Sequence, residues 1–315
     1  MRTSHPLPRA LRQPLAVGDA RDLGLTARRL RSTDLHRPFH GVVAARPLTF
    51  AERCRAYAQR LPRGGFFSGP TAALLHGLPL PSRHEREDAP LHVSVPAPVE
   101  APRGRGVIGH SVRLQLGDVV TLAGLPTSSP ARAWCELATL LSVEELVVVA
   151  DAIAHRRASG ATAEHLRAAV GSYPGRRGRR RLAEALELID ERAESPQESR
   201  LRVRLIRAGI TGLTVNLRIP TTTGPVYRAD LAFPEHRVIL EYQGDHHREL
   251  PQYRADVTRL LDLQADGWTV AYLGPDDIRA EGLTTRVRAI LALHPARSPR
   301  TRSGERSSRA ASAIG

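Results

Sequence analysis

The stretch YRADLAFPEHRVILEYQGDHH, residues 227–247, decides how the C-terminal half of the chain folds. Two strand-like runs, residues 227–233 and 237–243, flank a turn at Pro234, which is the pattern of an antiparallel hairpin. Residues 238–240 form a continuous apolar run, as expected for a strand that is covered on both faces. The sequence therefore predicts a hairpin whose second strand lies inside a sheet.

Two acidic residues interrupt these strands. Asp230 lies within the first run, and Glu241 ends the apolar part of the second. A carboxylate in such a place is costly to bury unless it is paired with a cation or bound to a metal ion. Where the two converge, they form an oxygen-rich site of the kind that binds Mg²⁺ or Mn²⁺. Glu198, on a helix predicted to begin at Ser195, is a candidate third carboxylate.

The flanking sequence completes a mixed sheet covered by helices. Helical spacing and strand-like runs alternate in the order helix, three strands, helix, strand and helix, over residues 195–209, 214–219, 227–233, 237–243, 253–265, 268–273 and 278–293. This order predicts an α+β or α/β domain.

Further polar residues follow the second strand of the hairpin. Either histidine of the pair His246 and His247 has the chemistry of a general acid or base, and we interpret His246 as an exposed turn residue and His247 as functional. A Zn²⁺ site ranks below Mg²⁺, because a closed histidine-rich site needs further ligands. Asp256 and Arg259 are three residues apart on one helix face. This spacing is compatible with three roles, which are an ion pair within the helix, orientation of the site, and contact with a phosphate.

The order and spacing of these residues over about 195–293 resemble the PD-(D/E)XK nuclease superfamily, and within it the uncharacterised family related to very-short-patch-repair endonucleases. The residues that carry this resemblance are Glu198, Asp230, Glu241-x-Gln243, Gly244, His247 and Asp256-x-x-Arg259. The resemblance implies a restriction-endonuclease-like fold in which Asp230 and Glu241 bind the metal ion, Glu198 is the helix acid and His247 is the histidine of the repair branch. Gln243 occupies the position of the superfamily's lysine, and the chain contains no lysine.

The N-terminal part has the pattern of a winged helix-turn-helix. Within residues 19–43, Thr26 is placed to cap a short second helix, and residues 37–43 read as the wing. In such a module the second helix enters the major groove, where arginines contact phosphates and guanine edges. The candidate DNA-binding residues on that helix are Arg28, Arg29 and Arg31, for which the alternative is a solvated arginine face.

The N-terminal region also resembles a known family. The motifs LTARRL at residues 25–30, HGVV at 40–43 and AALLHGL at 72–78 are similar to the AbiEi-type antitoxin and transcriptional-regulator family over about residues 15–154. The resemblance implies a DNA-reading head followed by a small α+β region, for which strand-like runs at 91–95, 107–114 and 119–122 are the sequence signal.

Composition points to a polyanionic partner. Arginine supplies all 46 basic charges against 32 acidic ones, so the formal net charge of the 315-residue chain is +14. Nucleic acid is the expected partner, with DNA ahead of structured RNA. The two cysteines, Cys54 and Cys135, are too few for a disulfide framework, and no apolar run approaches a membrane span, so a cytoplasmic protein without a membrane partner is expected. The oligomeric state is left open.

The expected organisation has five parts. They are a flexible N-terminus (1–14), a winged-helix region (15–171), a basic linker (172–181), a nuclease-like domain (182–293) and a disordered basic tail (294–315). The resulting expectation is a Mg²⁺- or Mn²⁺-dependent DNA endonuclease. The alternative is a non-catalytic DNA-binding regulator with a degenerate nuclease fold, which the glutamine at Gln243 favours.

Overall fold

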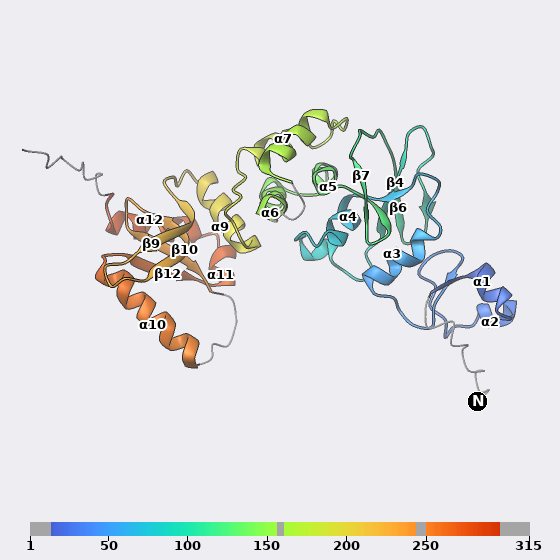
Figure 1. Ribbon diagram of the computed structural model, residues 1–315, viewed down its shortest axis with the longest axis horizontal. Helices are drawn as coiled ribbons and strands as arrows, with labels where there is room; N and C mark the ends of the chain where they lie inside the picture. The colour runs from blue at the N-terminus through green and yellow to red at the C-terminus, as the bar shows by residue number, and fades with distance from the viewer. Residues whose placement is uncertain (1–13, 156–160, 244–249, 297–315) are drawn as a thin grey trace, which may run out of the picture. The chain divides into compact units, whose positions relative to one another are not determined.

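The computed structural model describes residues 14–155, 161–243 and 250–296. Most of the expected flexible N-terminus, most of the expected basic tail, and Gly244, His246 and His247 therefore lie outside the described residues. The chain divides into two compact units, residues 1–203 and 204–315. Figure 1 shows the elements of each unit in chain order.

The first unit begins with a small β-α-α-β arrangement. Strands β1 and β2 pair antiparallel through Leu15 opposite Val43. Leu25 and Leu30 are buried with Val43 in one small core, and the Thr26 side chain caps α2 as its position in the sequence predicts. The elements are β1 (Leu15–Ala16), α1 (Val17–Asp22), α2 (Ala27–Leu30) and β2 (Val42–Val43).

A six-stranded mixed sheet follows, in the order β5-β6-β4-β3-β8-β7. The strands are β3 (Phe66–Phe67), β4 (Leu91–Pro96), β5 (Arg103–Gly104), β6 (Val107–Val112), β7 (Val119–Leu122) and β8 (Leu125–Ser128), with α3 (Phe50–Ala58) before them, α4 (Gly69–Leu75) after β3, and a 3₁₀ turn at Ser82–His84. Phe67 and Val93 are fully buried where β3 pairs with β4, which places the core of this region at the centre of the sheet.

Helices complete the first unit around a second core. Trp134 and Leu146 are fully buried there, and the Trp134 indole N–H donates to the Leu146 carbonyl at 2.8 Å. The helices are α5 (Pro130–Leu137), α6 (Val143–His155), α7 (Ala163–Ser172), α8 (Arg179–Leu186) and the first part of α9 (Pro196–Arg207).

The expected linker and the helix after it belong to this helical core. Arg181 donates to the Ala138 and Leu141 carbonyls, and Leu182 and Ala185 of α8 are completely buried. The sequence places a boundary at 172–181, whereas the two units divide between residues 203 and 204. The physical reason for the difference is that the apolar stripe of α8 is buried against the first unit.

The second unit is a four-stranded mixed sheet in the order β12-β11-β10-β9. Strands β9, β10 and β11 are antiparallel neighbours, and β11 pairs parallel with β12 after the crossover through α10. In Figure 1, α10 and α12 lie on opposite sides of this sheet. The elements are β9 (Thr214–Pro220), β10 (Val226–Phe233), β11 (Val238–Tyr242), α10 (Leu250–Ala265), β12 (Thr269–Leu273), α11 (Pro275–Arg279) and α12 (Leu283–Leu293).

The structure confirms the predicted hairpin and its buried second strand. Val238, Ile239 and Leu240 have no exposed surface, and Ile239 shares a core with Leu263 of α10. The chain is therefore an α+β protein built on mixed sheets. No helix in the described part of the chain has both the length and the apolar composition that crossing a bilayer requires.

Candidate active site

Asp230 and Glu241 lie at neighbouring positions across the hairpin of the second unit. The β10–β11 pairing runs through Leu231 opposite Leu240, so the next position along each strand is Asp230 and Glu241. The Tyr242 amide donates to Asp230 Oδ2 at 3.0 Å, so the Asp230 side chain bonds to the backbone of the facing strand. The two carboxylates are thus held at one point on the sheet by the hairpin register.

Arg259 of α10 reaches the same point. Its Nη2 donates to Glu241 Oε1 at 2.6 Å and its Nη1 donates to Oε2 at 3.3 Å, so both oxygens of the carboxylate are engaged. Nη2 also donates to the Arg228 carbonyl at 2.7 Å. Arg259 therefore forms an ion pair with Glu241 of the sheet, a partner that the sequence did not predict for it.

The Glu241 carboxyl is electrostatically unusual. The residue is only 8% exposed, and burial raises its pKa above the ordinary glutamate value. The negative charge of Asp230 raises the pKa further, while Arg259 and a backbone hydrogen bond at Asp230 lower it without cancelling the burial cost. A buried carboxylate with a perturbed pKa next to a second acid and a cation is typical of functional sites.

Tyr227 and Asp262 support the arginine, and the sequence analysis did not identify them. The Arg259 guanidinium lies 5.9 Å from the centre of the Tyr227 ring, and the Tyr227 hydroxyl donates to Asp262 Oδ2 at 2.5 Å. The available signal was the spacing of Asp256, Arg259 and Asp262, which are three apart along α10 and share a helix face.

The other predicted residues of the C-terminal unit are Gln243, Asp256 and His247. Gln243 follows β11, with its backbone amide donating to the Leu273 carbonyl at 2.9 Å and its side chain half-buried. Asp256 is half-buried on α10, one turn before Arg259. His247 lies outside the described residues, so its predicted role stays a prediction.

Glu198 lies in the first unit, on the first turn of α9. It is 7% exposed, and its Oε2 accepts a hydrogen bond from the Glu194 amide at 3.0 Å. The Glu198 amide in turn donates to the Ser195 hydroxyl at 3.2 Å. The contacts seen for Glu198 thus stabilise the start of a helix, as the serine and proline at that start predict.

The donor chemistry of the pair suits a hard cation. In the described residues, no group of three or more histidine, cysteine, aspartate or glutamate side chains is arranged to hold a metal ion. Asp230 and Glu241 supply two carboxylates. Mg²⁺ accepts such a set, because it takes one or two protein carboxylates and fills its remaining positions with water and substrate phosphate. The two residues therefore fit Mg²⁺ or Mn²⁺ in chemistry.

The three predicted DNA-binding arginines of the first unit differ in exposure and in hydrogen-bond partners. Arg28 and Arg31 are exposed. Arg29 instead forms a two-pronged ion pair with Asp34, at 2.7 and 2.8 Å. The helix that carries them is a single turn, so a groove-reading role rests on Arg28 and Arg31 rather than on all three.

A histidine pair lies in the sheet of the first unit. His92 Nδ1 and His110 Nε2 are 3.2 Å apart on the parallel strands β4 and β6, with their rings stacked. Burial lowers the pKa of His92 to about 4, with smaller lowering by His110 and His84, and burial also lowers the pKa of His110. Both imidazoles are therefore neutral at pH 7.

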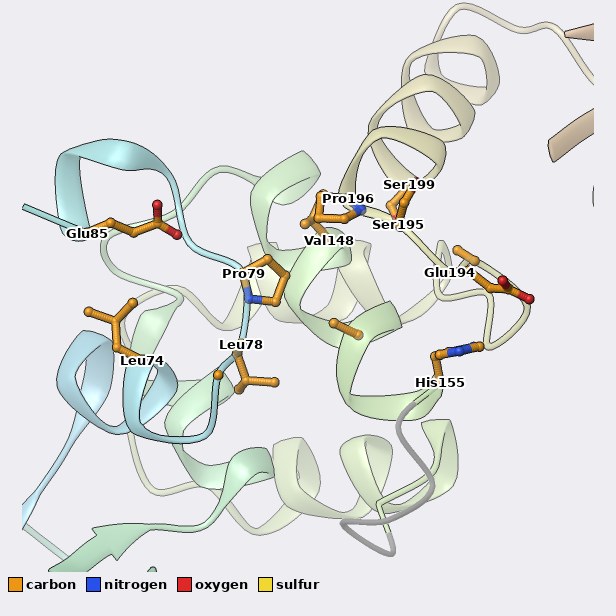
Figure 2. A pocket seen from close by; sticks show the side chains of 13 residues that line it. Leu74, Leu78, Pro79, Glu85, Val148, His155, Glu194, Ser195, Pro196 and Ser199 are labelled. Atoms are coloured by element: carbon orange, nitrogen blue, oxygen red, sulfur yellow. The ribbon is translucent and has the colours of Figure 1, made fainter. Parts of the chain in front are cut away.

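The first unit also contains a cavity of about 330 Å³, shown in Figure 2. Leu74, Leu78 and Pro79 form an apolar part of its wall. Glu85 lies at one end, and Glu194 lies near His155 at the other. The cavity has the mixture of apolar wall and few polar groups that small-molecule sites show, but it contains none of the predicted catalytic residues.

Two proteins of Mycobacterium tuberculosis are similar to this chain in sequence. Uncharacterized protein MT2308 of strain CDC 1551 / Oshkosh and uncharacterized protein Rv2248 of strain ATCC 25618 / H37Rv are each 30% identical to the chain over 194 residues, which is 61% of this chain and 70% of the relative. The chain belongs to the family of these mycobacterial proteins. The names of these relatives state no activity, so a function must be argued from the site.

Two further comparisons add no function. No family model matches the chain. The crystal structure of the RV2827C protein from Mycobacterium tuberculosis aligns with 61% of this chain and 76% of its own, at 14% identity and a TM-score of 0.36.

Proposed function

We propose that this chain is a metal-dependent DNA endonuclease, with a restriction-endonuclease-like second unit and a DNA-reading winged-helix segment at the start of the first. The observation that carries the proposal is the position of Asp230 and Glu241, one residue beyond the paired Leu231 and Leu240 of β10 and β11, with Arg259 donating to Glu241. The net charge of +14 supports a polyanionic substrate.

In this proposal each residue of the site has a separate task. Asp230 and Glu241 hold Mg²⁺ or Mn²⁺, which when bound acts as a Lewis acid toward the phosphate and acidifies a water molecule. Arg259 keeps Glu241 ionised against the burial that raises its pKa. Gln243, in the position of the superfamily's lysine, donates a hydrogen bond that orients the attacking water, and His247 carries its proton.

The first unit supplies affinity in the same proposal. Arg28 on α2 and Arg31, the residue that follows the helix, are both exposed. Contacts from these arginines to phosphates release counterions, so DNA affinity falls steeply as salt concentration rises.

A second candidate is a non-catalytic DNA-binding regulator. Two observations favour it: Gln243 brings no positive charge where the superfamily has lysine, and both oxygens of Glu241 are engaged by Arg259. A regulator of this kind keeps the fold and the DNA affinity but cleaves nothing.

Conversion of supercoiled plasmid separates the two candidates. Purified protein is incubated with plasmid and Mg²⁺ or Mn²⁺, with EDTA and the Glu241→Ala variant as negative controls. Glu235→Ala is the matched control, because Glu235 is an exposed acid in the turn of the same hairpin. The endonuclease predicts nicking or linearisation that needs metal and Glu241 but not Glu235. Intact plasmid with a shifted mobility on the gel supports the regulator instead.

A further inference from the structure

The Arg259 guanidinium binds the two carboxylate oxygens of Glu241 that a metal ion would use as ligands. Two donors of one guanidinium engage the two oxygens of the carboxylate, at 2.6 and 3.3 Å, and the closer donor also meets the Arg228 carbonyl. A Mg²⁺ ion binds carboxylate oxygen at about 2.0–2.1 Å and demands near-octahedral geometry. A guanidinium that already engages both oxygens of Glu241 therefore competes with the metal ion for the same lone pairs.

Arg259 is held by several contacts but remains partly exposed to solvent. Its side chain is 23% exposed, whereas that of Glu241 is 10% exposed. Its second anchor is a backbone carbonyl, and its third is the face of Tyr227, whose hydroxyl is fixed by Asp262. These contacts restrict the arginine to a position next to Glu241 and leave part of the guanidinium accessible from the surface.

A phosphodiester has the right chemistry to draw this arginine away. A guanidinium binds phosphate and carboxylate in the same two-pronged way, so a DNA phosphate at the site offers Arg259 a replacement partner. The carboxylate that it leaves is buried and next to another acid, which makes an ionised Glu241 without a cation costly. A divalent cation satisfies both carboxylates at once.

We propose that Arg259 is a built-in competitor for the metal ion, which closes Glu241 in the free protein and moves to a DNA phosphate when substrate binds. This inference rests on the proposed function and deepens it, because it makes metal binding depend on substrate. The coupling is reciprocal: DNA tightens metal binding, and the metal tightens DNA binding by the same factor.

Direct measurement of Mn²⁺ binding tests the competitor role without relying on cleavage. Free Mn²⁺ is followed by electron paramagnetic resonance at pH 8 in the presence of the full chain, with and without a short DNA duplex. The variants are Arg259→Met, which removes the charge, and Arg259→Lys, which keeps the charge but not the two-pronged contact. Arg218→Met is the matched control, since Arg218 is an exposed arginine on β9 of the same sheet. Intrinsic fluorescence from Trp268 of the second unit and Trp134 of the first reports whether each variant stays folded.

The expected pattern has three parts. The unaltered protein binds Mn²⁺ at least tenfold more tightly with DNA than without it. Arg259→Met binds Mn²⁺ at least tenfold more tightly than the unaltered protein when DNA is absent, and DNA no longer changes that affinity. Arg259→Lys falls between the two, and Arg218→Met behaves like the unaltered protein.

Two results overturn the inference in distinguishable ways. If the unaltered protein binds Mn²⁺ and the folded Arg259→Met and Arg259→Lys variants bind it no more tightly, Arg259 is not a competitor, and the endonuclease proposal stands. If neither the unaltered protein nor any folded variant binds Mn²⁺, with or without DNA, the metal site itself is absent, and the endonuclease proposal fails together with the competitor.

Discussion

A buried ion pair between Asp151 and Arg202 fixes the first part of α9 in the first unit, and removing its negative charge gives the sharpest stability prediction. Asp151 is 1% exposed and Arg202 is 3% exposed. Asp151 Oδ2 accepts from Arg202 Nη2 at 2.8 Å and from the Ser199 hydroxyl at 2.6 Å, while Oδ1 accepts from the Asp190 amide at 2.8 Å. Burial raises the pKa of the Asp151 carboxyl, against the lowering by Arg202.

The Asp151→Asn variant keeps the shape of the side chain and loses its charge. The Arg202 guanidinium then remains buried, with one contact to the Leu188 carbonyl and with an Nε that already has no hydrogen-bond partner in the structure. Leaving one partner of a buried pair uncompensated costs about 3–5 kcal/mol. With a denaturant slope of about 2 kcal/mol per molar urea, the unfolding midpoint falls by roughly 1.5–2.5 M.

The assay uses the single tryptophan of each unit. Trp134 is fully buried in the helical core of the first unit. The chain has two tryptophans, so replacing Trp268 with phenylalanine leaves Trp134 as the remaining one. Urea unfolding followed by Trp134 fluorescence then reports the first unit. Asp88→Asn is the matched control, because the Arg86–Asp88 pair is 68% and 73% exposed and such pairs contribute at most about 1 kcal/mol.

A double-variant cycle completes this test. Replacing both partners, Asp151→Asn with Arg202→Met, is expected to cost less than the sum of the two single changes, since neither charge is left alone. A midpoint shift below about 0.5 M for Asp151→Asn, corresponding to roughly 1 kcal/mol, would refute the reasoning. So would strictly additive single and double variants.

Three further predictions concern other parts of the first unit. The pKa of His92 is about 4 in the folded protein, against an ordinary value of 6.5. The free energy of unfolding therefore keeps the contribution of the neutral imidazole above pH 6.5 and loses it as pH falls toward 4, by about 2 kcal/mol between pH 7 and pH 5. The free energy of unfolding of His92→Gln, measured with urea, is expected to depend less on pH than that of the unaltered protein. Thr49→Ala removes the capping box of α3 and is expected to destabilise the unit by about 1 kcal/mol, measured by the same unfolding assay; no change in midpoint would contradict the capping role. Arg28→Ala and Arg31→Ala are each expected to reduce the slope of log DNA affinity against log salt by about 1, measured by fluorescence anisotropy, and an unchanged slope for both would count against phosphate contacts on α2.

Local sequence patterns predicted the elements of the second unit well. The hairpin around Pro234 and the amphipathic helix that ends before Gly267 depend on residues close together in the chain. The position of Asp230 opposite Glu241 follows directly from the short turn, because register fixes which residues face one another.

Interactions between distant residues were not predictable in the same way. Helix spacing predicted Arg259 near the site, but its two-pronged contact with Glu241, 18 residues away, depends on how α10 packs against the sheet. The strands β3 and β8 are only 2 and 4 residues long, too short for a periodic pattern. The α8 helix has a clear apolar stripe, but that stripe alone does not say which unit buries it.

The most direct test of the endonuclease proposal is the rate of plasmid nicking by Asp230→Asn relative to the unaltered protein, at saturating Mg²⁺ and with Glu235→Gln as the matched acid in the same hairpin. Loss of an outer-shell partner of a metal already costs about 10–100-fold in activity, so removing a ligand charge is expected to cost about 100-fold or more. The account predicts that loss for Asp230→Asn and full activity for Glu235→Gln, with unchanged DNA affinity for both variants when affinity is measured without divalent metal. Equal nicking rates for Asp230→Asn and the unaltered protein, with both proteins folded, would contradict it.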